Sequence, residues 1–175
     1  MDLYVVRHAI AHKRDRDRWP DDAERPLTPE GEERFRRVAG GILQLVPEVE
    51  MVLSSPFVRA WQTAEILEQA GWPAPVSCEA LEPDCPPHKV LDTIARYDGL
   101  GSVAVVGHRP GLHELVSYLL VGDADGMDVQ IKKGGVVRLQ FEGPPESGAG
   151  SLRWLLTPKA LQVSAPRRRP PVAES

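Results

Sequence analysis

Histidine and arginine side chains follow three short apolar runs of the sequence. The runs cover residues 3–6, 51–53 and 103–106, and the side chains that come after them are Arg7, His8, Arg59 and His108. Each run is short, rich in aliphatic residues and bounded by polar residues or glycine, which is typical of strands buried on both faces of a parallel sheet. Ligands of such sheets bind beyond the carboxyl ends of the strands. We therefore expect two imidazoles and two guanidinium groups to meet at one edge of a sheet.

The chemistry best suited to this group of side chains is the binding of a small oxyanion. Buried like charges repel one another unless an anion lies among them, and the planar fork of arginine matches two oxygens of a phosphoryl group. Helices expected after Ser55 and Pro110 would direct free backbone N–H groups to the same place. The whole chain has 21 Lys and Arg against 25 Asp and Glu, a formal net charge of −4. A basic site in an acidic chain suits a phosphoryl group better than nucleic acid.

Helical patterns lie between the apolar runs. Apolar residues recur at a spacing near 3.6 in three segments, which predicts amphipathic helices. A capping residue or a proline marks each start, and a glycine marks two of the ends. The segments are 35–46, 57–67 and 112–119, the start signals are Thr28-Pro29, Ser55-Pro56 and Arg109-Pro110, and the glycines are Gly71 and Gly122.

The alternation of strands and helices predicts an α/β fold, a three-layer α/β/α sandwich with a mainly parallel central sheet. The end of the chain differs, because apolar and polar residues alternate in 137–141 and 152–156 on either side of a connection rich in glycine and proline. These two segments predict antiparallel strands at the edge of the sheet. Proline and arginine then dominate, so we expect one domain over residues 1–163 and a disordered tail over 164–175.

The composition and the N-terminal residues indicate the cellular location of the protein. The two cysteines, Cys78 and Cys85, cannot form a disulfide framework and lack the spacing of a zinc site, so we expect reduced thiols. No apolar run approaches the ~18–20 residues that span a bilayer. The N-terminus also lacks the basic start and long apolar stretch of a signal peptide. We therefore expect a cytoplasmic protein with no membrane association, and a monomer, since no coiled-coil seam stands out.

Four segments of the chain resemble one known family. Residues Val6-Arg7-His8-Ala9 resemble the Arg-His-Gly signature of the histidine phosphatase superfamily, which has the phosphoglycerate mutase-like fold. Segments 25–31, 54–64 and 106–112 resemble three further motifs of that family, in the same order. Those motifs read R-P-L-T-x-x-G, S-S-P-x-x-R-A-x-Q-T-A and V-G-H-x-P-G. The short length and the two C-terminal strands look most like the SixA-type phosphohistidine phosphatase branch. Ala9 departs from the pattern, because most of the superfamily has glycine there, and its methyl group is expected to narrow the pocket.

The resemblance implies a role for each matching residue. His8 would be the nucleophile and would form a phosphohistidine intermediate that water hydrolyses. Arg7, Arg25 and Arg59 would bind the phosphoryl oxygens, and His108 would complete the pocket as a catalytic donor. No metal and no cofactor is implied, because guanidinium groups neutralise the charge of the phosphoryl group.

The proton donor and the substrate are left open by the sequence. Many members of the family place an acid after the third strand, where Glu82 is the first candidate here and Asp84 the second. An imidazole leaving from phosphohistidine needs less help from an acid than an alkoxide does, so no acid at all is the third possibility. We accordingly expect a metal-independent phosphatase acting on phosphohistidine proteins or similar phosphoramidates. The alternatives are a phosphatase of small metabolites such as sugar phosphates or nucleotides, and a non-catalytic module that binds phosphorylated ligands. A metal site made of His8 and His12, four residues apart, would need a helix where a strand is expected.

Overall fold

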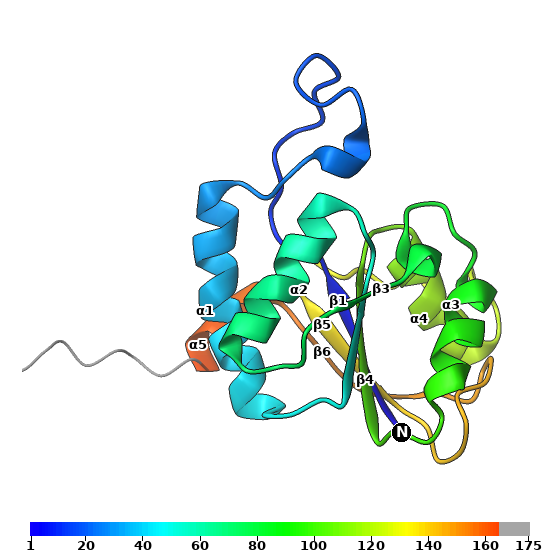
Figure 1. Ribbon diagram of the computed structural model, residues 1–175. Helices are drawn as coiled ribbons and strands as arrows, with labels where there is room; N and C mark the ends of the chain where they lie inside the picture. Colours follow the sequence, from blue (N-terminus) through cyan, green and yellow to red (C-terminus); the bar gives the residue numbers. More distant parts are fainter. Residues whose placement is uncertain (165–175) are drawn as a thin grey trace, which may run out of the picture.

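A computed structural model describes residues 1–164, and residues 165–175, which hold most of the expected tail, lie outside the described residues. The chain forms a six-stranded sheet between two layers of helices (Figure 1). The strands are β1 (Asp2–Arg7), β2 (Met51–Ser54), β3 (Val76–Ser77), β4 (Ser102–Gly107), β5 (Val136–Gln140) and β6 (Ser151–Leu156). The α-helices are α1 (Pro29–Leu45), α2 (Val58–Ala70), α3 (Pro87–Ile94), α4 (Gly111–Val121) and α5 (Pro158–Ser164), with short 3-10 helices η1 (Asp22–Glu24), η2 (Glu79–Leu81) and η3 (Ala95–Tyr97). The expected α/β sandwich is confirmed.

The sheet has the strand order β3-β2-β4-β1-β5-β6. The first four of these strands pair in parallel, whereas β5 and β6 pair antiparallel with their neighbours. The two expected antiparallel strands at the C-terminal edge are therefore confirmed. Because β1 and β4 are adjacent, with Arg7 opposite Gly107 in the ladder, the residues that follow both strands leave the sheet side by side.

The two faces of the sheet are covered by different helices. Helices α1, α2 and α5 lie on one face, and α3 and α4 lie on the other (Figure 1). Successive side chains of a strand point to opposite faces. Val6 accordingly packs in the same core cluster as Phe35 of α1, while Val5 packs in the cluster that contains Leu115 of α4. Burial on both sides explains why β1 is a continuous apolar run with no polar alternation.

Two kinds of helix signal are confirmed. The Thr28 hydroxyl accepts a hydrogen bond from the Gly31 amide at 2.9 Å, which satisfies a free N–H at the start of α1. Gly71 and Gly122 follow α2 and α4 with φ of 134° and 80°, values that favour a residue without a Cβ.

The start predicted for α2 is wrong. The helix begins at Val58 with Phe57 at the capping position, and not at Pro56 with Ser55 as the cap. The Ser55 hydroxyl accepts a hydrogen bond from the Phe57 amide at 3.3 Å, which stabilises a turn before the helix. The turn places the Ser55 side chain against His108, so this serine belongs to the site and not to a helix cap.

Helix α5 was not predicted, because its seven residues are too few to show a periodic pattern. It packs against α1, where Gly41 allows a very close approach. A Cβ added at Gly41 would lie 1.9 Å from the carbonyl oxygen of Leu161. The start of α5 also lies next to the segment that leads into β5, since a Cβ added at Gly134 would lie 3.6 Å from Cγ of Pro158.

Within residues 1–164, none of the helices is both long and apolar enough to span a bilayer. The cytoplasmic location and the monomeric state remain predictions.

Candidate active site

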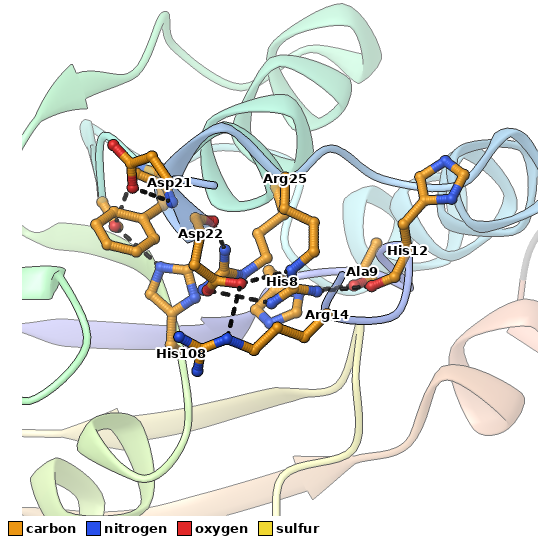
Figure 2. Close-up of polar contacts among 12 residues, drawn as sticks. His8, Ala9, His12, Arg14, Asp21, Asp22, Arg25 and His108 are labelled. Atoms are coloured by element: carbon orange, nitrogen blue, oxygen red, sulfur yellow. Dashed lines mark hydrogen bonds and ion pairs between the residues drawn. The ribbon is translucent and has the colours of Figure 1, made fainter. Parts of the chain in front are cut away.

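Two histidine rings meet where β1 and β4 end. The backbone N–H of His8 donates to the carbonyl of Gly107 at 3.0 Å, which extends the β1–β4 ladder by one residue. The ring centroids of His8 and His108 are 5.1 Å apart, and both residues are buried. The structure thus brings together the two histidines that the strand-end argument placed at this edge (Figure 2).

His8 is held in one tautomer by the backbone. Its Nδ1 lies 2.7 Å from the carbonyl oxygen of Ala9. A carbonyl only accepts hydrogen bonds, so Nδ1 carries the proton and Nε2 keeps its lone pair. Burial, with Arg59, Arg7 and Lys133 nearby, lowers the pKa of His8 to about 3, against the weaker raising effect of the Ala9 carbonyl. At neutral pH His8 is therefore a neutral imidazole with Nε2 free to act as a nucleophile.

His108 lies between the first histidine and the turn before α2. Its Nε2 is 3.0 Å from the Ser55 hydroxyl, and its ring packs against Phe57 with the centroids 5.3 Å apart. Burial first, then the proximity of His8 and Arg59, lowers the pKa of His108 to about 2. His108 is thus neutral in this structure. A bound dianion would favour its protonated form, because an opposite charge nearby stabilises imidazolium.

Arg7 and Arg59 are anchored from the backbone, with their guanidinium groups at the site. Arg7 donates through Nη1 to the carbonyl of Ile131 at 2.7 Å, and Arg59 donates through Nη1 to the carbonyl of Asp22, also at 2.7 Å. Burial is the main cause that lowers the pKa of Arg59 to about 10, and it also lowers the pKa of Arg7. Both side chains remain cationic at neutral pH and have little freedom of movement.

Asp22 joins the arginines of the site, although it was not among the residues predicted from the sequence. Its carboxylate accepts from Arg25 at 2.8 Å and contacts Nη2 of Arg59 at 3.1 Å and Nε of Arg14 at 3.9 Å. Figure 2 shows this carboxylate among the arginines and beside His108. The hydrogen bond from Arg25 is the main cause that lowers the pKa of Asp22. The available signal was an aspartate three residues before Arg25, a spacing that allows pairing within one turn.

Arg25 is placed at the rim of the site, with its side chain 14% exposed. Besides Asp22 it donates to the carbonyl of His12 at 2.7 Å, which ties together the two ends of the loop 12–25. Because Arg25 and Arg59 share one carboxylate, Asp22 sets the distance between two guanidinium groups that come from different elements.

Two hydrogen bonds through the backbone of Ile131 connect α4 to Arg7. Nε2 of His113 accepts a hydrogen bond from the backbone N–H of Ile131 at 3.2 Å, and the carbonyl of the same residue accepts from Arg7. His113 and Arg7 thus hold the Ile131 backbone from both sides. The segment 131–133 contains no motif and was not predicted to take part in the site, although Lys133 is close enough to lower the pKa of His8.

The two acid candidates lie to one side of the histidines. Glu82 follows η2 and lines a small cavity that His108 also lines. Within the described part of the chain, no hydrogen bond or ion pair joins the Glu82 carboxylate to the histidines or arginines of the site. Asp84 is exposed and has φ of 67°, the left-handed region. The structure therefore does not choose between Glu82, Asp84 and no acid.

His12 stands apart from this cluster. No helix connects it to His8, and its ring packs on Trp19 with the centroids 5.0 Å apart. In residues 1–164 there is no group of three or more histidine, cysteine or carboxylate side chains suited to hold a metal ion.

The cluster is rich in buried nitrogen atoms that lack an acceptor. Within the described residues, four buried side-chain nitrogens have no hydrogen-bond partner, and three of them are Nε of Arg7, Nε of Arg59 and Nδ1 of His108. Native proteins leave few such groups unsatisfied, and each calls for a functional or structural reason. An oxyanion at this edge would supply acceptors and negative charge to a pocket that has an excess of both donors and positive charge.

Comparison with known proteins supports the same assignment. Residues 3–82 match the family described as the histidine phosphatase superfamily (branch 1). The chain is 36% identical over 143 residues to an uncharacterized protein of Picosynechococcus sp. (strain ATCC 27264 / PCC 7002 / PR-6), covering 80% of this chain and 85% of that protein. It is 30% identical over 172 residues to phosphohistidine phosphatase SixA of Escherichia coli (strain K12), covering 94% of this chain and 98% of SixA. A solved structure of the protein histidine phosphatase SixA complexed with tungstate superimposes with a TM-score of 0.80 at 27% identity, covering 92% of this chain and 99% of that one.

Proposed function

Because the chain belongs to the histidine phosphatase superfamily, in its SixA-type branch, we propose that it hydrolyses phosphohistidine or a related phosphoramidate through a covalent intermediate on His8. The observation that carries this proposal is a buried, neutral His8 with a free Nε2, surrounded by guanidinium groups. Nucleophilic imidazole and fixed cations are the two parts that phosphoryl transfer requires. A solved SixA structure carries tungstate, a tetrahedral oxyanion, which is consistent with an anion pocket of this kind.

The reaction has two displacements at phosphorus. In the first, Nε2 of His8 forms a bond to phosphorus while the bond from phosphorus to the leaving nitrogen breaks, and the leaving imidazole takes up a proton from solvent water. In the second, water attacks the phosphohistidine, gives up a proton to solvent and releases inorganic phosphate, while the bond from phosphorus to Nε2 breaks and His8 returns to its neutral form. Arg7, Arg25 and Arg59 bind the phosphoryl oxygens, whose charge is greatest in the transition state. His108 donates a further hydrogen bond once the anion raises its pKa.

The state of the nearest carboxylate favours a phosphoramidate substrate. Asp22 lies at the arginines, but its lowered pKa keeps it ionised at neutral pH, so it has no proton to give to a leaving alkoxide. An imidazole leaves with less assistance. We further propose that neither a metal nor a cofactor takes part, because the guanidinium groups supply the positive charge that Mg²⁺ supplies in other phosphatases.

The second candidate is a phosphatase of small phosphomonoesters, which Glu82 favours because it shares a small cavity with His108. Replacement of Glu82 by Gln separates the two functions. Loss of alkyl phosphate hydrolysis with phosphoramidate hydrolysis retained would favour the first function, whereas equal loss of both would make Glu82 a general acid for this enzyme. Glu79→Gln is the matched control, since Glu79 is an exposed carboxylate that is not an acid candidate, and Asp84→Asn tests the second acid candidate in the same way.

The covalent intermediate is tested by trapping. Mixing the protein with a ³²P-labelled phosphohistidine peptide should give an acid-labile, base-stable label that maps to His8. The His8→Ala variant should lose the label and at least about 10³-fold in kcat, while His12→Ala, which changes a histidine in the same segment, should keep both. Phosphate release by His8→Ala at the wild-type rate would refute the mechanism. Ligand binding without turnover by the wild type would instead favour the non-catalytic module.

A further inference from the structure

A basic groove adjoins the active site on the side of Arg7. It lies between α1, the segment before β5 and the start of α5, and its volume is about 530 Å³. Figure 1 shows α1 and α5 side by side on this flank of the sheet. The cations that line the groove are Arg7, Arg34, Lys132, Lys133 and Lys159. They come from four separate parts of the chain, so folding alone gathers them.

The positive charge of this groove is not balanced. No aspartate or glutamate is among its lining residues. In residues 1–164, the side chains of Arg34, Lys132, Lys133 and Lys159 form no ion pair or hydrogen bond, whereas the neighbouring Arg36 and Arg37 of α1 pair with Glu32 and Glu33. Arg34, Lys132, Lys133 and Lys159 are also exposed, so a partner in solution can reach them. Like charges gathered without a counter-charge repel one another and raise the free energy of the folded chain. A bound anion relieves this repulsion.

The groove is continuous with the phosphoryl site through two residues. Arg7 lines the groove and directly precedes His8 in the chain. Lys133 lines the groove and directly precedes Gly134, whose backbone N–H donates to the carbonyls of Arg7 at 2.9 Å and of His8 at 3.1 Å. A substrate whose phosphoryl group is bound at the histidines therefore has its neighbouring atoms at the entrance of the groove. The volume far exceeds what a phosphoryl group needs and suits several residues of a polypeptide.

The residues that line the groove favour a polypeptide over a nucleic acid as its ligand. None of the lining residues is aromatic, so bases have no ring on which to stack. The net charge of the whole chain is −4, which disfavours a long polyanion but leaves a short acidic segment free to bind.

We propose that this groove binds an acidic segment of a phosphoprotein substrate, with the carboxylates of the segment on the four exposed cations. The proposal rests on the proposed function and extends it, since it names an acidic polypeptide flank as the feature that the enzyme selects. Charge pairs at such a rim increase the rate of association and the specificity for one partner.

The test compares three substrates: a phosphohistidine peptide with an acidic flank, the same peptide with a neutral flank, and free phosphoramidate. Wild type should prefer the acidic peptide through a lower KM, and the preference should shrink as salt rises. The R34E/K159E double variant should lose about 10-fold or more in kcat/KM for the acidic peptide. The R36E/R37E double variant makes the same change of charge elsewhere on the surface. Its kcat/KM for the acidic peptide should stay at the wild-type value.

An unchanged ratio of acidic to neutral peptide in R34E/K159E would overturn the proposal, as would inhibition by an oligonucleotide that exceeds inhibition by the unphosphorylated acidic peptide. Hydrolysis of free phosphoramidate at the wild-type rate by R34E/K159E shows that the variant is folded. If that variant fails to fold, the milder R34Q/K159Q gives the same comparison. A wild type that hydrolyses none of the three refutes the proposed function alone, and calorimetric titration with the unphosphorylated acidic peptide then still tests the groove.

Discussion

The candidate site has a floor and a shell that differ in how they are held. The floor consists of Arg7, His8, Arg59 and His108, which sit at strand ends or in the first turn of a helix, and all four are buried. The shell consists of Asp22, Arg25, His113 and the segment 131–133, which apart from the buried Ile131 are more exposed and are joined by side-chain contacts. The ends of β1 and β4 and the first turn of α2 place the floor residues, whereas each part of the shell depends on a partner distant in sequence.

This contrast predicts a gradient of effects. In the proposed mechanism the floor residues supply the nucleophile and the cations that stabilise the transition state, so their loss should lower kcat. Shell residues adjust how tightly the anion is held, so their loss should act more on affinity. Three variants measured by kinetics or inhibition test this gradient, and unfolding in acid tests the burial of the two floor histidines.

The largest effect is expected from Arg59→Lys on the floor. Lysine keeps the charge but not the planar fork that contacts Asp22 and that can bind two phosphoryl oxygens at once. We expect kcat to fall about 10²- to 10³-fold, the usual cost of losing one donor to the transition state. Steady-state kinetics with a phosphoramidate measures it. Arg138→Lys, which alters an ion pair with Asp2 away from the site, should keep wild-type activity. A loss of less than threefold in Arg59→Lys would place this arginine outside the floor.

The second prediction concerns how the free energy of unfolding depends on pH. His8 and His108 have pKa values of about 3 and about 2 in the folded protein, against about 6.5 in the unfolded chain. The unfolded state then binds more protons below pH 6.5, so the free energy of unfolding decreases as pH falls towards the folded values. The decrease is about 2 kcal/mol per histidine between pH 6.5 and pH 5.

Denaturant unfolding at several pH values measures this loss. His108→Gln should remove its own share of the slope, while His88→Gln, which changes an exposed residue of α3, should leave the slope unchanged. A His108→Gln variant that loses as much stability in acid as the wild type would contradict the burial of a neutral imidazole.

The third effect is expected from Asp22→Asn in the shell. The carboxylate pairs with Arg25 and Arg59, so it would compete with a bound oxyanion for both guanidinium groups. Removing its charge should tighten inhibition by inorganic phosphate about 5- to 10-fold, because two guanidinium groups lose their internal counter-ion. Asp21→Asn is the control, because Asp21 is exposed and forms no ion pair in the described part of the chain. Weaker inhibition by phosphate in Asp22→Asn would show that Asp22 positions the arginines more than it competes with the anion.

The smallest effect is expected from His113→Phe. Phenylalanine keeps a ring on α4 but cannot accept the hydrogen bond from the Ile131 N–H, so the segment that anchors Arg7 should loosen. We expect KM to rise about threefold with kcat within twofold, in line with the loss of roughly one hydrogen bond. His113→Gln, which retains an acceptor, should restore KM, and His88→Phe should have no effect. A change confined to kcat would exclude this positioning role.

The fold was largely accessible from the sequence, because most elements carry local signals. The β1 and β4 runs are buried on both faces and therefore contain no polar alternation, and Thr28 caps α1 through its own side chain. Local signals failed where a contact at long range decided the structure. Ser55 lies in a turn against His108 and not at a helix cap, and the short α5 is stabilised by its packing on α1.

The sequence by itself determined the floor of the site, since residues that follow parallel strands must meet at one edge whatever the loops do. It also determined the family, through motifs that each stay within one short segment. Only the tertiary structure decided the shell and the groove. Asp22 meets Arg59 across 37 positions of the chain, and Arg7 meets Ile131 across 124. Such pairs have no pattern in the sequence, because their geometry comes from how loops on a rigid sheet are packed together.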